Sequence, residues 1–178
     1  MKKYVKKIVG LTICAMLLVS VTACEGISNG NQSTPENTTS SVVESSGISK
    51  GEICGKIIDD IKNYCHLSDM QNIDKEQLFS LYGIKDEYVA YFAGIKSGNS
   101  VSKDEAIVVQ AMEEGSACSV RDCLQNHYDK ILKESQEYLP DEYEKIKNSK
   151  VVKDGIYVYL FISDENDKME DIYKSYDK

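Results

Sequence analysis

Residues 151–162 have the sequence VVKDGIYVYLFI, and this stretch decides which fold we predict. Asp154-Gly155 separates two apolar runs and is the strongest hairpin signal in the chain, because both positions tolerate a positive φ. Along the second run, aromatic residues at positions 157, 159 and 161 alternate with aliphatic residues at 156, 158, 160 and 162. Both faces of this strand are therefore apolar, which favours a sheet that is covered on both faces.

The elements around this hairpin follow from the spacing of apolar residues. Further strands are predicted over residues 87–95 and 105–112, joined by a loop that contains Gly98-Asn99. Helices are predicted over residues 50–66, 74–82, 116–138, 141–148 and 167–176. Gly83 supplies a left-handed stop for the second helix, and Pro140 breaks the long one. This order predicts an α+β two-layer sandwich on a four-stranded, mainly antiparallel sheet, with a hairpin, a long helix and a second hairpin between N- and C-terminal helices.

The first 23 residues have the features of a signal peptide. Four lysines precede residue 8, and residues 8–23 form an apolar run that is short for a permanent membrane span. Val21-Thr22-Ala23-Cys24 resembles the lipobox of bacterial lipoproteins. The resemblance implies cleavage before Cys24 and attachment of acyl chains, palmitate among them, to its thiol. The alternative is an ordinary secretory signal in which Cys24 receives no lipid.

The charge balance changes when the signal peptide is removed. The whole chain has 21 basic and 29 acidic residues, a net charge of −8, and four of the basic residues precede Cys24. The mature chain therefore carries 21 − 4 = 17 basic residues against 29 acidic ones, a net charge of −12. Such a chain lacks the basic surplus that nucleic-acid binding requires, and anionic lipid headgroups repel it. We expect it to touch the membrane only through its lipid.

The mature chain has two parts of different composition. Residues 24–49 are rich in Ser, Thr, Asn and Gly and hold few aliphatic residues, which predicts a flexible linker that begins at the lipid-anchored Cys24. Residues 50–178 are predicted to form one globular domain. Together with the signal peptide and the lipid-anchored Cys24, this organisation predicts that the protein lies on the extracytoplasmic face of the cell membrane.

Four cysteines remain in the predicted domain: Cys54, Cys65, Cys118 and Cys123. Small buried thiols are the favoured interpretation. Alternatively, Cys54 pairs with Cys123 and Cys65 with Cys118, which would join the first helix to the long one. Cys123 and His127 could also share a metal ion, with Cys65 or His66 completing a zinc site, but this signal is weak, and we predict neither metal nor cofactor.

The sequence contains no motif for covalent catalysis or for phosphate binding, and we predict no catalytic residue. The strongest candidate for binding is aromatic: Tyr157, Tyr159 and Phe161 would form a platform for a protein, peptide or glycan partner if one sheet face were uncovered. If helices cover that face, these rings are core. We therefore expect a binding or scaffolding module, with a thiol-dependent enzyme or a hydrolase of the cell envelope as the alternative.

Several diffuse motifs together resemble a known family. They are Tyr82-Gly83 before the first strand pair, the strand Glu105-Ala-Ile-Val-Val, the long Gln- and Tyr-bearing helix, Tyr138-Leu139-Pro140, and Gly155-Ile156-Tyr157-Val158 within the closing stretch. They are similar to the bacterial lipoprotein family of domain of unknown function 4358, over most of residues 50–170. The resemblance implies a location and an architecture, but no catalytic residue.

Replacement of Cys24 by alanine tests the lipid anchor. We expect the Cys24→Ala protein to appear in the medium or to remain unprocessed, because it lacks the thiol that receives the acyl chains, and two or more chains are needed for stable attachment. Partition between detergent and aqueous phases measures this. A Cys24→Ala protein that still partitions with detergent as a processed lipoprotein contradicts the assignment.

Overall fold

The computed structural model describes residues 52–178. Cys24, the predicted signal peptide and the predicted linker lie outside the described residues.

Within residues 52–178, five strands form one antiparallel sheet in the order β1-β2-β3-β5-β4. Their bounds are Met70–Asn72 for β1, Val89–Ser97 for β2, Glu105–Ala111 for β3, Lys150–Asp154 for β4 and Tyr157–Ile162 for β5. The central strand β3 pairs with β5 from Glu105 opposite Ile162 to Gln110 opposite Tyr157. The two predicted hairpins are therefore confirmed, and the β3–β5 pairing joins them.

The sheet has one strand more than the four we predicted. β1 pairs with the end of β2, from Met70 opposite Ser97 to Asn72 opposite Ile95. Three residues are too few to show an alternating pattern, so nothing local marks this strand. Gly94 of β2 allows Ile73, the residue after β1, to approach β2 closely, because a Cβ atom at position 94 would lie 2.7 Å from Cδ1 of Ile73.

The helices lie close to their predicted positions. Within the described residues they are α1 (Glu52–Tyr64), α2 (Lys75–Ser80), the 3₁₀ turn η1 (Asp86–Tyr88), α3 (Glu114–Tyr138), α4 (Pro140–Lys147) and α5 (Asn166–Ser175). α2 starts with a capping box, in which Gln77 N donates to Asp74 Oδ1 (2.7 Å) and Asp74 N donates to Gln77 Oε1 (3.1 Å). Gly83 has a φ of 70°, as expected of a left-handed stop. Pro140 ends α3 and is also the first residue of α4, a position where its missing N–H costs nothing.

The turn between β4 and β5 is shifted by one residue from the predicted Asp154-Gly155. Asp154 still pairs with Tyr157, so Gly155 and Ile156 form the two-residue loop. Only Gly155 has a positive φ, 58°, which matches a type II′ turn with glycine at its first central position. The hairpin is thus confirmed, although its turn geometry differs.

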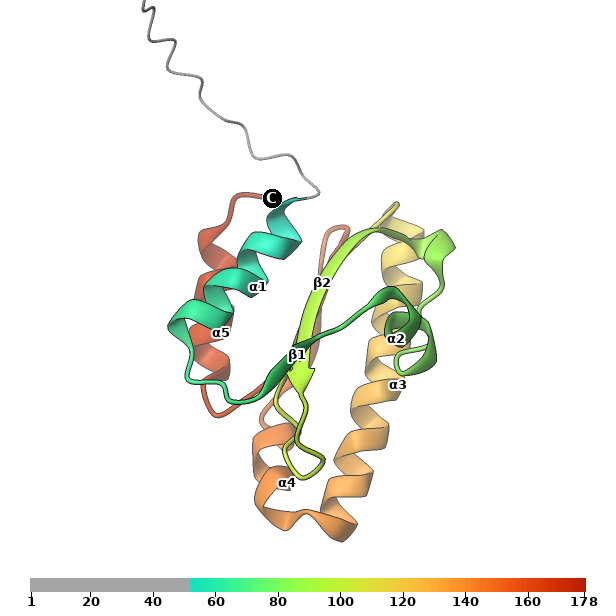
Figure 1. Cartoon of the computed structure of the whole chain (residues 1–178). Coiled ribbons are helices and arrows are strands. Elements are labelled where there is room, and N and C mark those ends of the chain that lie inside the picture. Colours follow the sequence, from blue (N-terminus) through green and yellow to red (C-terminus); the bar gives the residue numbers. More distant parts are fainter. Residues whose placement is uncertain (1–51) are drawn as a thin grey trace, which may run out of the picture. The chain divides into compact units, whose positions relative to one another are not determined.

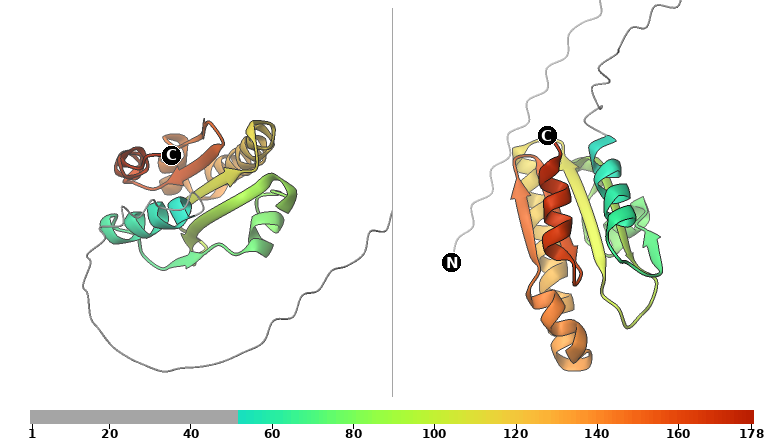
Figure 2. Two further views of the ribbon diagram at one scale, coloured as in Figure 1. Left: turned by 90° about the horizontal axis from the view of Figure 1, so that it is seen from above. Right: turned by 90° about the vertical axis from the view of Figure 1, so that its left-hand side faces the viewer.

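Helices cover both faces of the sheet, so the domain has three layers and not the predicted two. Figure 1 and the view from above in Figure 2 show α1 and α5 on one side of the strands and α2 and α3 on the other. The physical reason is that every residue of β3 and β5 is buried, and apolar side chains project from both faces of both strands. One layer of helices could shield only half of them.

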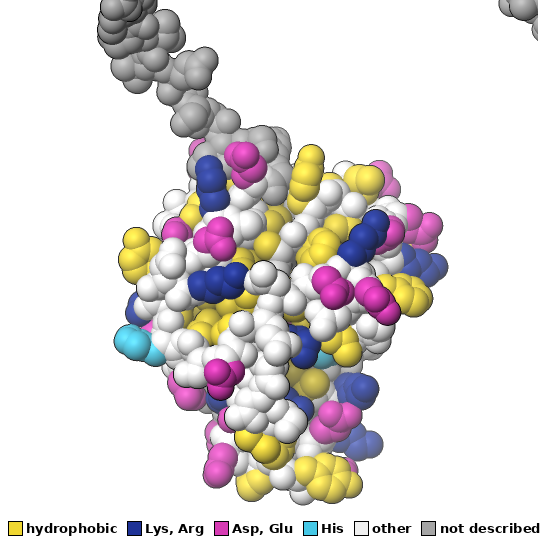
Figure 3. Space-filling model, viewed as in Figure 1, with side chains coloured by type: hydrophobic (Ala, Val, Ile, Leu, Met, Phe, Trp, Pro, Cys, Tyr) yellow, Lys and Arg dark blue, Asp and Glu magenta, His cyan; other side chains and the backbone are white. Residues whose placement is uncertain are grey.

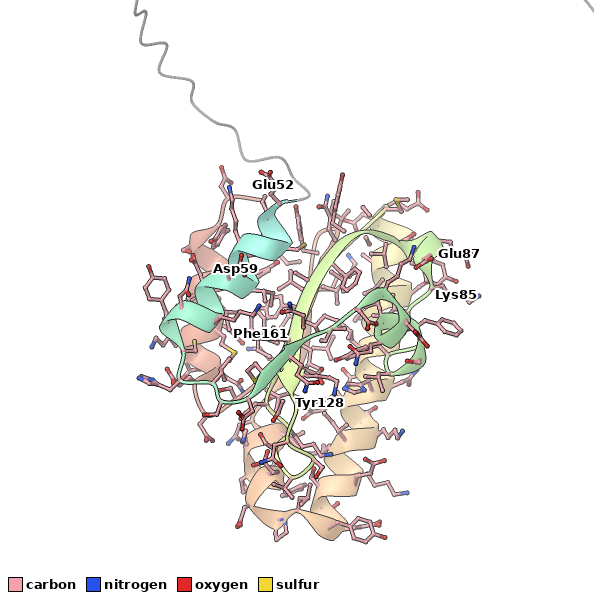
Figure 4. The ribbon with its side chains drawn as sticks, in the orientation of Figure 1. Glu52, Asp59, Lys85, Glu87, Tyr128 and Phe161 are labelled. Carbon is pink, nitrogen blue, oxygen red and sulfur yellow. The ribbon has the colours of Figure 1, made fainter. Side chains whose placement is uncertain are left out.

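The aromatic strand face lies beneath α1 and α5. Tyr157, Tyr159 and Phe161 are 4%, 3% and 3% exposed, and Figure 4 shows Phe161 in the interior beside α1. The Tyr159 ring stacks on Phe161 (centroids 4.7 Å apart) and packs against Tyr173 of α5 (4.2 Å). These residues form a core, and the platform that we considered for them is not exposed.

Truncation of this aromatic core tests the three-layer arrangement. We expect Tyr159→Ser to lower the free energy of unfolding by about 3–5 kcal/mol, because it removes a buried ring and leaves a cavity. Tyr138→Ser is the control, since Tyr138 is 76% exposed, and we expect a change within about 0.5 kcal/mol. Urea denaturation of the detergent-purified protein measures both values. Equal stability of the two variants would show that α1 and α5 do not cover this face.

Candidate functional site

A cavity of about 350 Å³ lies between the loop that joins β2 to β3 and the helix α3. Its wall combines residues from the end of β2, most of the loop, the start of β3, the segment after α2 and the middle of α3. The residues that matter for its chemistry are Tyr82, Lys96, Ser97, Lys103, Glu105 and His127. We refer to this space as the Glu105 cavity.

Glu105 is the first residue of β3 and is only 6% exposed. Residues two apart in a strand share one face of the sheet, so Glu105 lies on the same face as Ile107 and Val109, which pack in the core cluster under α3. Its Oε2 lies 3.2 Å from Nε2 of His127 on α3, whose side chain is 12% exposed. A buried carboxyl group without a hydrogen-bond partner costs free energy, and the imidazole of His127 provides such a partner.

The hydrogen bond to Glu105 uses Nε2 of His127, and no hydrogen bond joins Nδ1 of the same ring to another described residue. The ring of His127 lines the cavity.

Tyr82 completes the buried polar group. Its ring centroid lies 4.5 Å from that of His127, and its side chain packs in the same core cluster. Burial raises the pKa of the Tyr82 phenol far above its ordinary value, and the charge of Glu105 raises this pKa further. The phenol thus stays protonated. A hydrogen bond to the Glu105 side chain also raises this pKa, so the phenol and the carboxyl group lie next to each other, although neither the hydroxyl nor Oε1 of Glu105 has a hydrogen-bond partner of ordinary length among the described residues.

The loop on the opposite side of the cavity is held in place by Lys145 of α4. The Nζ atom of Lys145 lies 2.9 Å from Asp104 Oδ1 and 3.0 Å from Glu142 Oε2, and Glu142 also accepts a hydrogen bond from the backbone N–H of Lys103 (2.7 Å). Burial disfavours the charge on Lys145, but its hydrogen bonds to both carboxylates outweigh this effect and raise its pKa. The loop is therefore anchored by a charged network that is mostly shielded from solvent.

Two other lysines of the cavity wall have no such partner. Lys96 at the end of β2 and Lys103 in the loop both line the cavity, and neither has a carboxylate within 4 Å among the described residues. Elsewhere on the face shown in Figure 3, charged side chains of both signs are interspersed. Lys96 stands opposite Glu105 in the β2–β3 register, so the cavity wall holds side chains of both charges.

The sequence-based candidates are only partly related to this cavity. Cys24 lies outside the described residues, and Tyr157, Tyr159 and Phe161 lie in the core on the other side of the sheet. His127, which we considered as a metal ligand together with Cys123, is instead paired with Glu105. Glu105 itself was missed. Its only signal is an acidic residue at the start of a strand that is otherwise almost wholly apolar.

The four domain cysteines are thiols. Cys54 and Cys65 belong to the core cluster beneath α1 and α5, whereas Cys123 packs against the cluster beneath α3. The sheet separates the two helices, so the disulfides between the first and the long helix that we considered cannot form. The same separation keeps Cys65 and His66 away from Cys123 and His127, and within residues 52–178 no three potential ligands gather around one point.

Burial makes most of these thiols poor nucleophiles. It raises the pKa of the Cys54 thiol to about 12, and it also raises the pKa values of Cys65 and Cys123. Since the thiolate is the reactive form, these three cysteines are not activated for chemistry at neutral pH. The fourth, Cys118, is exposed on α3.

Comparisons with known proteins yield one match. Residues 63–163, more than half of the chain, match the model of a family described as Domain of unknown function (DUF4358). No curated protein and no solved structure matches the chain. Among the described residues, no helix has both the length and the apolar character that a membrane crossing requires.

Alkylation rates test the placement of the cysteines. With N-ethylmaleimide at neutral pH we expect Cys118 to react first and Cys54 at least about 100-fold more slowly, because burial restricts both its access and its thiolate fraction. Mass spectrometry of digested samples taken over time identifies each adduct. The Cys118→Ser variant should lose the fast phase alone. Rapid modification of Cys54 without denaturant would contradict the described packing of α1.

Proposed function

The chain belongs to the domain of unknown function 4358 family, and on that premise we propose that it is a membrane-anchored extracytoplasmic lipoprotein whose domain binds a small ligand in the Glu105 cavity. In this proposal the lipid on Cys24 attaches the protein to the cell membrane, the linker separates the domain from the surface, and the domain is a binding module. The cavity volume of about 350 Å³ falls at the lower end of the range of small-molecule sites.

Sequence features support the membrane anchor. The basic start, the short apolar run and the lipobox Val21-Thr22-Ala23-Cys24 occur in the order that lipoprotein processing requires. A mature net charge of −12 keeps the domain from adhering to anionic headgroups, so the domain stays accessible to ligands on the extracytoplasmic side.

One observation carries the proposal of binding: a buried Glu105–His127 pair lies in the wall of a cavity. A buried pair of ionisable side chains is seldom needed for stability, since apolar residues of the same volume often serve as well or better. Ionisable groups that are buried next to a cavity are instead typical of functional sites. The pair therefore favours a role in recognition over a role in packing.

A hydrolase of the cell envelope is the second candidate, and the same pair supports it. An imidazole that is oriented by a carboxylate can act as a general base toward water. However, among the described residues no serine or cysteine is hydrogen-bonded to His127, so the nucleophile of covalent catalysis has no counterpart here. The raised thiol pKa values also argue against the thiol-dependent enzyme. A binding function needs no nucleophile, so it accounts for the geometry of the Glu105–His127 pair with fewer additional groups than hydrolysis does.

A thermal-shift screen tests the binding function. In a library of small polar metabolites, we expect some compounds to raise the Tm of the detergent-purified full-length protein by about 5 °C at saturating concentration. The same compounds should leave the Tm of Glu105→Leu unchanged, because that variant removes the carboxylate and disrupts the orientation of His127. Glu114→Leu is the matched control, since Glu114 is an exposed acid on α3 outside the cavity.

The result that would overturn this function is a screen in which no compound stabilises the protein, or in which every stabilising compound acts equally on Glu105→Leu. Turnover of a stabilising compound, detected in the same samples by mass spectrometry, would replace the binding module with the hydrolase.

A further inference from the structure

We propose that the first half of β2, residues 89–93, is a docking edge for an extended, basic segment of a partner protein. The segment adds to the sheet as a short strand beside β2, in line with β1. We refer to residues 89–93 as the β2 edge. These residues are not part of the Glu105 cavity, so the edge and the cavity can each function, or fail, without the other.

The β2 edge is open because β1 covers only the end of β2. β1 pairs with residues from Ile95 to Ser97, and the backbone N–H of Ile73 then donates to the carbonyl of Gly94 (2.8 Å). Among the described residues, no segment other than β3 pairs with residues 90–93 or shares a backbone hydrogen bond with them. Figure 1 shows β1 across the lower part of β2, with the upper part of β2 uncovered in front.

The backbone of the β2 edge presents a donor and an acceptor to an added strand. In an antiparallel sheet, alternate residues direct both their N–H and their C=O groups to the same side. Gly94 accepts its hydrogen bond on the β1 side, so Phe92 directs its N–H and C=O to that side as well. A bulge between Val89 and Tyr91 interrupts the ladder to β3. The regular part of the edge is therefore short, and we expect an added strand of about the length of β1.

The side chains of the β2 edge lack the protection that edge strands usually have. Residues 89–95 include no charge and no proline, none of residues 89–93 is buried, and Tyr91 is 53% exposed. The opposite edge strand, β4, carries Lys150 and Lys153. Charged side chains on an edge strand discourage pairing with other chains. In the view of Figure 1, Figure 3 shows hydrophobic surface on the upper part of this face.

The charge of the protein selects a basic occupant. A cavity of about 640 Å³ at the start of β2 contains Phe79, and its charged lining consists of two lysines and three acids: Lys75, Lys85, Glu76, Asp86 and Glu87. Figure 4 labels two of these residues, Lys85 and Glu87, beside the start of β2. The lining thus has one negative charge in excess, and the mature chain carries a net charge of −12. A second copy of the chain would bring the same negative charge and be repelled.

The two faces of the β2 edge favour different side chains in the added strand. Tyr91 lies on the same face as Ala93 and Ile95, and an aromatic ring pairs well with a β-branched residue on the neighbouring strand. Phe92 lies on the other face, where α2 contributes Glu76 and Phe79 to the cavity. Basic side chains on that face would approach the excess acid. A segment in which β-branched and basic residues alternate matches both faces, and its main chain supplies the hydrogen bonds.

A model peptide tests this docking on the detergent-purified full-length protein. The probe is a capped peptide of about seven residues in which valine and lysine alternate, since valine favours a strand. One control peptide has proline in place of the central valine, and the other has glutamate in place of lysine. We expect both controls to bind at least about tenfold more weakly, because proline cannot donate to the ladder and glutamate is repelled. Fluorescence anisotropy of labelled peptides measures each Kd.

Hydrogen exchange locates the bound peptide on the protein. The Phe92 amide should exchange rapidly in the free protein, because it faces the open edge. With saturating valine–lysine peptide we expect this amide to exchange at least about tenfold more slowly. The amide of Ala93 is the internal reference, since it faces β3 with or without the peptide. NMR spectroscopy resolves the two amides.

A charge placed on the edge tests the selection of the occupant. Tyr91→Lys should weaken the valine–lysine peptide about fivefold and strengthen the glutamate peptide, because it adds a like or an opposite charge beside the added strand. Tyr138→Lys is the matched control, since Tyr138 is 76% exposed on α3, and it should leave both affinities unchanged. A Tm measured for each variant establishes that it is folded.

Three results would overturn the docking edge. The first is a failure of the valine–lysine peptide to bind, or equal binding of the proline peptide, which would mean that no strand is added. The second is equal binding of the glutamate peptide, which would mean that charge does not select the occupant. The third is a dimer in solution whose Phe92 amide is already protected without peptide, which would assign the edge to a second copy of the chain.

Discussion

The pairing of β3 with β5 is the constraint on which the rest of the domain depends. It brings two strands without an exposed residue to the centre of the sheet, and their side chains are apolar on both faces. Each face then needs its own helical cover, which α1 and α5 supply on one side and α3 on the other. The short strand β1, in contrast, contributes only three residues at the edge. It is the centre of the sheet that requires three layers.

The candidate site arises where this apolar centre is interrupted. Glu105 begins β3 on the face that α3 covers, and a charged residue at that place needs a partner from the covering helix. His127 provides it, on the same helix whose apolar residues Val120 and Leu124 seal the core. The Glu105–His127 pair is thus part of the contact between sheet and helix, and the cavity lies beside that contact. Rigid secondary elements hold a binding group more precisely than a loop does.

The two sides of the cavity are held by different means. His127 and Glu105 are fixed by the packing of α3 on the sheet, whereas the wall that bears Lys103 is fixed by the charged network around Lys145. α4 therefore has a role beyond the connection of α3 to β4, because it positions the loop. In the proposed arrangement, a lipid anchor at Cys24 and the linker predicted from the sequence would leave such a site free to face its ligand.

The sequence by itself determined the local elements. Period-two and helical spacing located four strands and the helices, and Gly83 and Pro140 marked helix ends correctly. The lipobox predicts the anchor at Cys24. Only the tertiary structure decided the rest: the pairing of β1 with Ile95–Ser97, the burial of Tyr159 under α5, and the meeting of Glu105 with His127, which are 22 residues apart. Local patterns reflect each segment's own preference for a conformation, whereas these contacts join distant segments and exist only once the helices have packed on both faces of the sheet.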